Sequence, residues 1–209
     1  MKIAKSLGII VTTVGIVVMA GWIFDIGILK SILPFWVTMK FTTAFSFLLS
    51  GITLYFIVDL VENESEIARV ILPITLLIIL LLMATLLIST FLGIRTGIED
   101  LFVRESEGAV KTVTPGRPSV GTMISFISIA IAGFVAMSTL KKSKPKLRII
   151  GGIISVAGIA AIIGYIANTP FLYYAIGNVS TAMAFHTAIL FILLGMGLLL
   201  LPGSKNNVD

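Results

Sequence analysis

The sequence contains few residues that could carry out covalent or metal chemistry. It has no cysteine and one histidine, His186. Covalent catalysis requires a nucleophile held beside a base, and haem or copper sites require several nitrogen or sulfur ligands. The sequence offers neither, so we predict that the protein is not an enzyme and binds no metal or other cofactor. For His186 we expect ordinary hydrogen bonding near a membrane surface, with a pH-responsive role or metal ligation as the alternatives.

A stretch of thirteen residues occurs twice and is the most informative pattern in the chain. The copies are MKFTTAFSFLLSG at 39–51 and MAFHTAILFILLG at 183–195, with seven identical positions. A weaker third copy, PSVGTMISFISIA, lies at 118–130. Such self-similarity predicts three related units laid end to end. The candidate site comprises matching residues of the three copies together with the histidine: Met39, Thr43, Phe47, Gly51, Thr122, Phe126, Met183, His186, Thr187, Phe191 and Gly195.

The matching residues within a copy are four positions apart, so they form one ridge along a helix. In the first copy this ridge consists of Met39, Thr43, Phe47 and Gly51. A threonine in a membrane helix bonds to its own backbone or to a neighbouring helix, and glycine allows close helix approach. The ridge therefore predicts a packing seam where three helices meet at a pseudo-threefold centre. Alternatively, it lines a ligand cavity that opens outwards, and the two roles are compatible.

The composition is that of an integral membrane protein. Hydrophobic residues make up 57% of the chain and charged residues 12%, and the mean hydropathy is +1.12. Six apolar runs approach the ~20 residues that a membrane-spanning helix needs. We predict an all-α integral membrane protein in which 1–209 is a single membrane domain. Its six transmembrane helices would form three repeated helical hairpins, at about 5–60, 68–140 and 149–201. The runs lie at 7–24, 41–60, 68–93, 122–140, 149–167 and 183–201.

The distribution of basic residues predicts the orientation in the membrane. The termini and the turns after the second and fourth spans carry nine Lys and Arg, whereas the three longer connectors carry six. By the positive-inside rule, the N and C termini are cytoplasmic and the protein is a multi-pass protein of the plasma membrane. We expect its basic turn to contact anionic head groups of the lipid bilayer and no nucleic acid. This turn comprises Lys141, Lys142, Lys144, Lys146 and Arg148.

The three outward connectors are rich in large aromatic side chains. Anchoring in the membrane interface is the ordinary explanation for them, and an aromatic-lined pocket for a small ligand is the alternative. We also expect a short interfacial helix at 26–33 and another short helix at 97–103. The rings in and beside the connectors are Trp22, Phe24, Phe35, Trp36, Phe91, Phe102, Tyr165, Phe171, Tyr173, Tyr174 and Phe185.

The apolar runs lack the charges that ion-coupled transporters keep at membrane depth. This absence argues against such a transporter. The fifth span has small residues four positions apart, as in Gly151 and Ser155, and this spacing predicts close helix packing. The acidic residues nearest the spans lie at their ends or in connectors: Asp25, Asp59, Glu99 and Asp100.

Three segments carry a resemblance to a known group of proteins. They are ISTFLGIRTGIEDLF, PGRPSVGTMISF and MAFHTAILFILLGMGLLLL. Together with the two thirteen-residue copies, they resemble the N-terminal multi-span membrane region of certain bacterial and archaeal sensor histidine kinases and diguanylate cyclases. This resemblance implies a helical sensor bundle whose ligand is generally undefined. Such regions precede cytoplasmic signalling domains, and the present chain holds none after Leu201. No catalytic residue can be carried over.

From these observations we expect a non-catalytic sensory or accessory module in the membrane. It would bind an outer-face or membrane-borne ligand and act through a membrane or cytoplasmic protein partner. A structural subunit of a larger membrane complex is the first alternative, in which the small-residue faces of the last two spans dock on neighbours. An uncoupled channel or carrier is the second.

Overall fold

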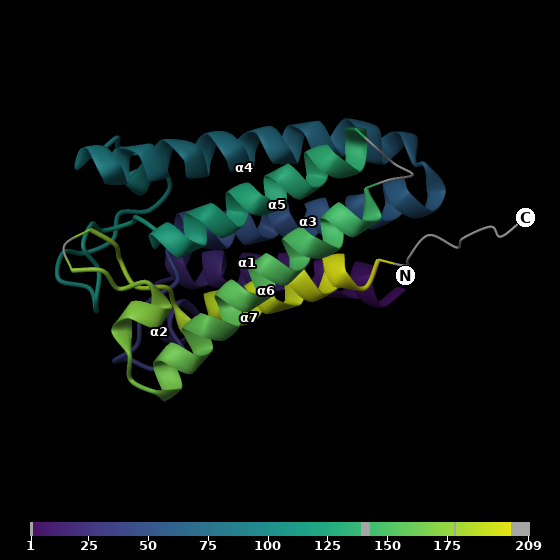
Figure 1. Ribbon diagram of the computed structural model, residues 1–209. Helices are drawn as coiled ribbons and strands as arrows, with labels where there is room; N and C mark the ends of the chain where they lie inside the picture. Colours follow the sequence, from purple (N-terminus) through teal and green to yellow (C-terminus); the bar gives the residue numbers. More distant parts are fainter. Residues whose placement is uncertain (1, 139–142, 178, 202–209) are drawn as a thin grey trace, which may run out of the picture.

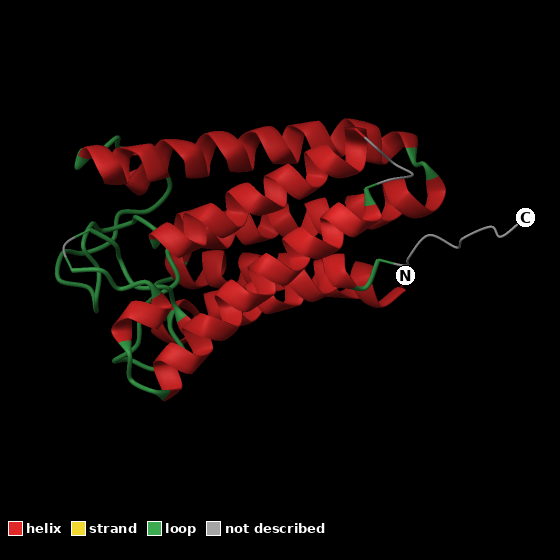
Figure 2. Ribbon diagram, in the orientation of Figure 1, coloured by secondary structure: helices red, strands yellow, loops and turns green. Residues whose placement is uncertain are grey.

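The computed structural model describes residues 2–138, 143–177 and 179–201, and this part of the chain is a bundle of helices without strands (Figures 1 and 2). Three helical turns lie in the connecting segments: α2 (Gly27–Lys30), η1 (Ile98–Asp100) and η2 (Pro170–Tyr173). The main helices are α1 (Lys2–Ile23), α3 (Phe41–Asn63), α4 (Glu66–Leu92), α5 (Val120–Ser138), α6 (Lys144–Ile166) and α7 (Phe185–Leu199).

Five of these helices are long and apolar enough to cross a bilayer. Their outer faces are apolar too, since Ile10, Leu81 and Ile153 expose 46%, 60% and 60% of their surface. Exposing such an apolar exterior to water is unfavourable, whereas contact with lipid chains is not. The prediction of a helical membrane protein is therefore confirmed.

The sixth apolar run forms a shorter helix than predicted. The run covers 183–201, but α7 has 15 residues, which corresponds to a length of ~22 Å against a hydrocarbon core of ~30 Å. The difference at its start has a local cause. The Met183 N–H donates to the Tyr173 carbonyl at 2.8 Å, and this bond holds Met183 in the connector. The helix begins two residues later, after an extended Ala184.

Local chemistry explains where the other helices begin and end. Ser65 caps α4 by accepting a hydrogen bond from the Ala68 N–H, and α4 ends at Gly93, whose φ of +66° suits glycine. Pro145 lies in the first turn of α6, where no intrahelical N–H partner is needed. Pro73 lies inside α4, within its first turns.

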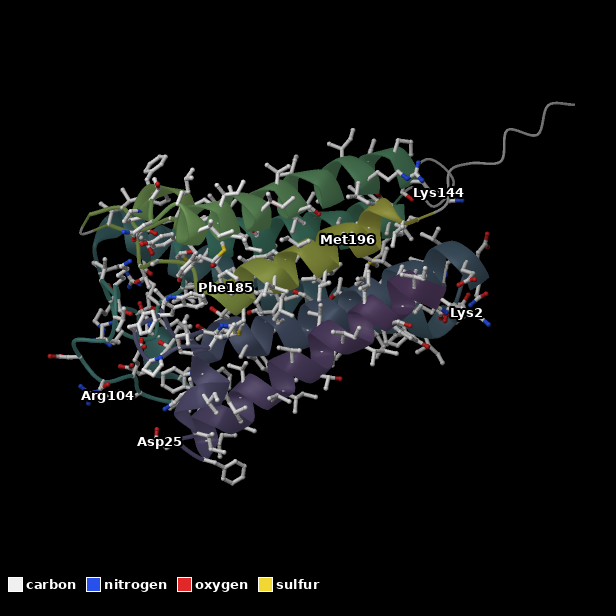
Figure 3. The ribbon with its side chains drawn as sticks, turned by 90° about the horizontal axis from the view of Figure 1, so that it is seen from below. Lys2, Asp25, Arg104, Lys144, Phe185 and Met196 are labelled. Atoms are coloured by element: carbon white, nitrogen blue, oxygen red, sulfur yellow. The ribbon has the colours of Figure 1, made fainter. Side chains whose placement is uncertain are left out.

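The helices pair as α1 with α3, α4 with α5, and α6 with α7, and α3 also contacts α5 and α7. The three long connectors, 24–40, 93–119 and 167–184, gather at one end of the bundle, which we call the connector end (left in Figure 1). The opposite end, the terminal end, holds the start of α1 and the end of α7. Figure 3 shows the same separation, with Lys2 and Lys144 at one end and Asp25 and Arg104 at the other.

The first and third hairpins are packed through glycine. A Cβ atom added to Gly8 of α1 would lie 2.8 Å from the Gly51 carbonyl oxygen, and one added to Gly151 of α6 would lie 2.7 Å from the Gly195 carbonyl oxygen. These helices therefore touch backbone to backbone. The same kind of contact recurs two turns further along α1 and α6. There, an added Cβ on Gly15 would lie 2.8 Å from the Ala44 carbonyl oxygen, and one on Gly158 would lie 2.6 Å from the Ala188 carbonyl oxygen.

The second hairpin is packed differently. Helix α4 contains no glycine, and it presents buried leucine, isoleucine and methionine side chains at its inner face. The glycine on its partner, Gly133 of α5, meets the side chain of Leu76 and not a backbone atom. The α4–α5 contact is therefore made by side chains.

The short helices predicted in the connectors are shorter than expected. The one predicted at 26–33 is reduced to Gly27–Lys30, and the one predicted at 97–103 is a single turn at Ile98–Asp100. Ser31 explains the first difference, because its extended backbone ends the helix and its Oγ donates to the carbonyls of Leu33 and Trp36. Such side-chain bonds to the backbone compete with helix formation.

Candidate functional site

Three phenylalanine rings meet at the centre of the bundle. Phe47 of α3, Phe126 of α5 and Phe191 of α7 pack with ring centroids 4.8 to 4.9 Å apart, at tilted or edge-on angles. All three side chains are fully buried. Such angles are favourable for aromatic pairs and add to the stabilisation from burial. The phenylalanines of the three sequence copies therefore form one cluster.

The methionines of the two strong copies are held in the same way. The Met39 carbonyl accepts a hydrogen bond from Trp22 Nε1, and the Met183 carbonyl accepts one from Tyr165 Oη, each at 2.8 Å. Their N–H groups donate to connector carbonyls, those of Lys30 and Tyr173. Both methionine side chains are buried. These bonds fix the points at which the chain enters α3 and α7.

The threonines of the three copies are buried near the connector end. Thr43, Thr122 and Thr187 expose 3%, 2% and 1% of their surface. Thr122 lies 2.8 Å from the Ser119 hydroxyl, which also accepts the Thr122 N–H and so caps the start of α5.

The glycines of the ridge do not join the central cluster. An added Cβ on Gly51 would collide with Gly8 and Thr12 of α1, and one on Gly195 would collide with Gly151 and Ser155 of α6. The ridge therefore serves two contacts. Its phenylalanines face the other return helices, and its glycines face the outgoing helix of the same hairpin. The small residues of the fifth span are likewise used inside the chain, against α7.

His186 lies in the first turn of α7, next to Phe185. Both ring nitrogens are shielded from solvent, and among the described residues neither has a hydrogen-bond partner. The described residues therefore do not provide the hydrogen bond that we expected for this residue. Within the described ranges there is also no group of three His, Cys, Asp or Glu side chains that could hold a metal ion.

The connector end contains a buried ion pair that joins the first and second connectors. Lys40 Nζ lies 2.6 Å from Glu105 Oε1, and the two side chains expose 2% and 4% of their surface. The carboxylate also accepts hydrogen bonds from Thr38 Oγ1 and the Gly116 N–H, and the ammonium donates to Thr112 Oγ1. Burial lowers the pKa of Lys40, and the adjoining carboxylate opposes that shift.

A second buried ion pair organises the long middle connector. Arg117 donates through Nε and Nη2 to Glu99 Oε1, and its Nη2 also donates to the Ile94 carbonyl at 2.6 Å. The Glu99 side chain is fully buried. Burial by itself raises the pKa of Glu99, but the hydrogen bonds from Arg117 and Thr96 outweigh it and hold that pKa below its ordinary value.

The third connector is tied to the second by several hydrogen bonds. Lys111 Nζ donates to Tyr173 Oη, and the Ala182 N–H donates to the Lys111 carbonyl at 3.1 Å. The Val113 N–H donates to Thr181 Oγ1 at 3.2 Å. The three connectors are thus one layer over the starts of the return helices α3, α5 and α7.

An open hollow of about 590 Å³ lies in this layer, between the second and third connectors. Its volume falls in the range of small-molecule sites. Smaller hollows of about 330 Å³ and 210 Å³ lie at the first connector and at the α1–α3 contact. The hollow of about 590 Å³ is lined by Ala109, Lys111, Thr112, Val113, Pro170, Ala175, Gly177 and Ser180.

The connector aromatics divide into two groups. Trp36, Tyr165 and Phe185 pack on one another with ring centroids 4.7 to 5.5 Å apart, so they join the first connector to the third hairpin. Phe24 and Phe35 are about 70% exposed, as anchors in a membrane interface would be. The 590 Å³ hollow is not lined by aromatic rings.

The basic turn lies at the terminal end (Figure 3). Lys144, Lys146 and Arg148 belong to the first turns of α6, and Lys141 and Lys142 lie outside the described residues. Arg148 Nε donates to the carbonyls of Leu199 and Leu201, where a cation complements the C-terminal end of α7.

Sequence reasoning missed the two buried ion pairs. Glu105 and Lys40 are 65 residues apart, and neither belongs to a periodic element, so no spacing rule connects them. The available signal is the group of charged residues in the long second connector, where Arg117 lies between Gly116 and Pro118. Comparison of the chain with models of known protein families, with characterised proteins and with solved structures gives no match.

Proposed function

We propose that the chain is a six-helix membrane module of three hairpins, without catalytic activity, that binds a ligand at its connector end and acts through a protein partner. The observation that carries this proposal is the layer of three connectors. A buried ion pair joins the first connector to the second, and hydrogen bonds join the second to the third. A hollow of about 590 Å³ opens between the second and third connectors, and the layer lies directly over the starts of the return helices. A ligand in the layer would therefore act on all three return helices together.

The three-hairpin arrangement is supported by matched contacts. Trp22 and Tyr165 donate to the carbonyls of equivalent methionines, and the phenylalanines of all three copies share one cluster. In this arrangement each outgoing helix leads to an outward connector, and each return helix begins beneath it.

The orientation follows from the basic residues. The connector end faces outwards and the terminal end faces the cytoplasm of a cell whose plasma membrane holds the protein. The partner then binds at the terminal end or along the bundle. The resemblance to the membrane regions of sensor kinases and diguanylate cyclases agrees with a module that receives a signal outside and passes it inwards.

The two alternatives gain less support. A subunit that docks through the small residues of its last two spans needs those residues on its surface, but Gly151 and Gly195 are used in the contact between α6 and α7. A channel or carrier needs a path along the bundle axis, and the fully buried Phe47, Phe126 and Phe191 fill its centre.

The first experiment is purification of the tagged protein in a gentle detergent, with mass spectrometry of the proteins that accompany it and a thermal-shift screen of small molecules. We expect a ligand that raises the melting temperature saturably, since a ligand at a hundred times its Kd stabilises a protein by about 2.7 kcal/mol. We also expect a signalling partner. A stoichiometric set of membrane proteins without any ligand would favour the structural subunit. Flux in liposomes that Thr43→Trp abolishes would favour the channel.

A further inference from the structure

The connector layer holds more positive than negative charge. Its three segments carry six basic and five acidic side chains, and the third segment, 167–184, carries no charged residue. Four ion pairs are formed: Lys30 with Asp25, Lys40 with Glu105, Arg95 with Asp100, and Arg117 with Glu99.

Two basic residues of the layer, Arg104 and Lys111, make no ion pair with any described residue. Lys111 lines the hollow of about 590 Å³, whereas Arg104 does not. Lys111 therefore lines this hollow and has no carboxylate within ion-pair distance among the described residues.

The position of Lys111 is held by its surroundings. Its backbone has a φ of +48°, which a residue with a side chain rarely adopts. The hydrogen bond from the Ala182 N–H to the Lys111 carbonyl fixes this turn against the third connector. Its ammonium donates to Tyr173 Oη and lies 4.8 Å from the centroid of that ring. Tyr173 is a neutral partner, so it orients the ammonium without neutralising its charge.

The remaining wall of the hollow combines polar and apolar groups. Thr112 and Ser180 are polar residues of this wall, and Val113, Pro170 and Ala175 are apolar ones. A ligand with an anionic group and a small apolar part would match this wall, because charge-assisted hydrogen bonds to an ammonium are stronger than neutral ones.

We propose that this hollow binds a small ligand that carries a carboxylate or phosphate group, with the anionic group on Lys111 and the apolar part against Pro170 and Ala175. This assignment rests on the proposed ligand-binding function and names the chemical class of its ligand. The same anionic chemistry occurs in soluble metabolites and in lipid head groups, and the test separates these sources.

The test titrates the purified full chain with succinate, benzoate and inorganic phosphate, and with the neutral analogues succinamide and benzamide, by calorimetry in detergent. We expect at least one anion to bind saturably and its neutral analogue not to bind. Lys111→Met should weaken that binding roughly ten- to a hundredfold, and Lys111→Arg should restore most of it. Arg104→Met is the matched control, because it removes the other basic side chain of the layer that forms no described ion pair, and the Kd of this variant should be unchanged.

A second variant and a second medium complete the test. Ala175→Phe fills the apolar side of the hollow and should reduce binding while Lys111 is intact. The second medium is a pair of nanodisc preparations, one of phosphatidylglycerol and one of phosphatidylcholine. If wild type binds phosphatidylglycerol more tightly and Lys111→Met does not, the anionic group belongs to a lipid head group. If soluble anions bind in detergent, the anionic group belongs to a soluble metabolite.

The outcomes separate this assignment from the proposed function. If an anion binds equally well to wild type, Lys111→Met and Ala175→Phe, the site is wrong although ligand binding stands. If a neutral or cationic molecule from the thermal-shift screen binds and no anion does, the ligand class is wrong and the sensory function stands. If neither an anion nor any screened molecule binds, both proposals fail.

Discussion

Lys40 and Glu105 form an ion pair of 2.6 Å in which both side chains are almost completely excluded from solvent. The pair joins the residue before α3 to the middle of the second connector, 65 residues further along the chain. Removing one member leaves the other charge buried without its partner, which typically costs about 3–5 kcal/mol. The geometry of the connector layer therefore depends on both members.

Lys40→Met and Glu105→Gln should each lower the free energy of unfolding by about 3–5 kcal/mol. The double variant should be less unstable than the sum of the two, because it leaves no unpaired charge. Unfolding of the purified protein in a denaturing detergent measures these differences. Asp25→Asn is the control. Asp25 is 92% exposed and pairs with Lys30, so its loss should leave the free energy of unfolding nearly unchanged. Additive losses at positions 40 and 105 would contradict the pairing.

The stability of the middle connector should fall in acid. The pKa of Glu99 is lowered in the folded protein, so the folded state binds its proton less readily than the unfolded chain does. Its stabilisation is complete above the ordinary glutamate pKa of ~4.3 and is lost as the pH falls through the lower, folded value.

Glu99→Gln should lower the melting temperature at pH 7 and reduce its dependence on pH below about 4.5. A melting series from pH 7 to pH 3 measures both effects. Glu107→Gln, at an exposed residue of the same connector that makes no described ion pair, should behave like wild type. Equal acid sensitivity in Glu99→Gln and wild type would show that another group is responsible.

Adjacent glycines of α6 should respond in opposite ways to the same substitution. A Cβ on Gly151 would lie 2.7 Å from the Gly195 carbonyl, whereas a Cβ on Gly152 meets nothing within 4 Å. Gly151→Ala should destabilise the protein by about 1–3 kcal/mol through overpacking. Gly152→Ala should be neutral or stabilising by up to ~1 kcal/mol, because alanine favours a helix. Thermal unfolding of the two variants decides the matter, and equal stability would mean that α6 and α7 are not in backbone contact.

The hydrogen bond from Tyr165 to the Met183 carbonyl can be removed without changing the ring. Tyr165→Phe should cost about 1 kcal/mol or somewhat more, since the carbonyl loses a buried donor. Tyr55→Phe is the matched control, because the Tyr55 hydroxyl makes no hydrogen bond with a described residue and the ring contact with Lys5 remains. Comparison of the melting temperatures tests the bond. A smaller loss at Tyr165 than at Tyr55 would count against its contribution.

The helices could be predicted because their information is local. An apolar run of suitable length predicts a membrane helix whatever the rest of the chain does. The end of such a run is less informative. Met183 looks like the start of the last helix in the sequence, but its N–H is taken by the Tyr173 carbonyl, a partner that no helical pattern indicates.

The candidate site was only partly accessible to the same reasoning. The spacing of Phe47 and Gly51 places them on one ridge of the helix. A ridge of residues four positions apart can still contact two neighbouring helices. Which neighbour each residue contacts depends on the packing of the whole bundle. The buried ion pairs belong to irregular connectors, where charge partners are determined by three-dimensional proximity and no period exists to reveal them.

The different packing of the hairpins has a mechanical consequence. In the first and third hairpins, glycines place one backbone directly against another, so no side chain is available to absorb a relative displacement. In the second hairpin, flexible side chains such as Leu76 lie between α4 and α5, and rotamer changes there accommodate small sliding movements. We therefore expect the first and third hairpins to move as units, and shear within the bundle to be concentrated at the α4–α5 contact.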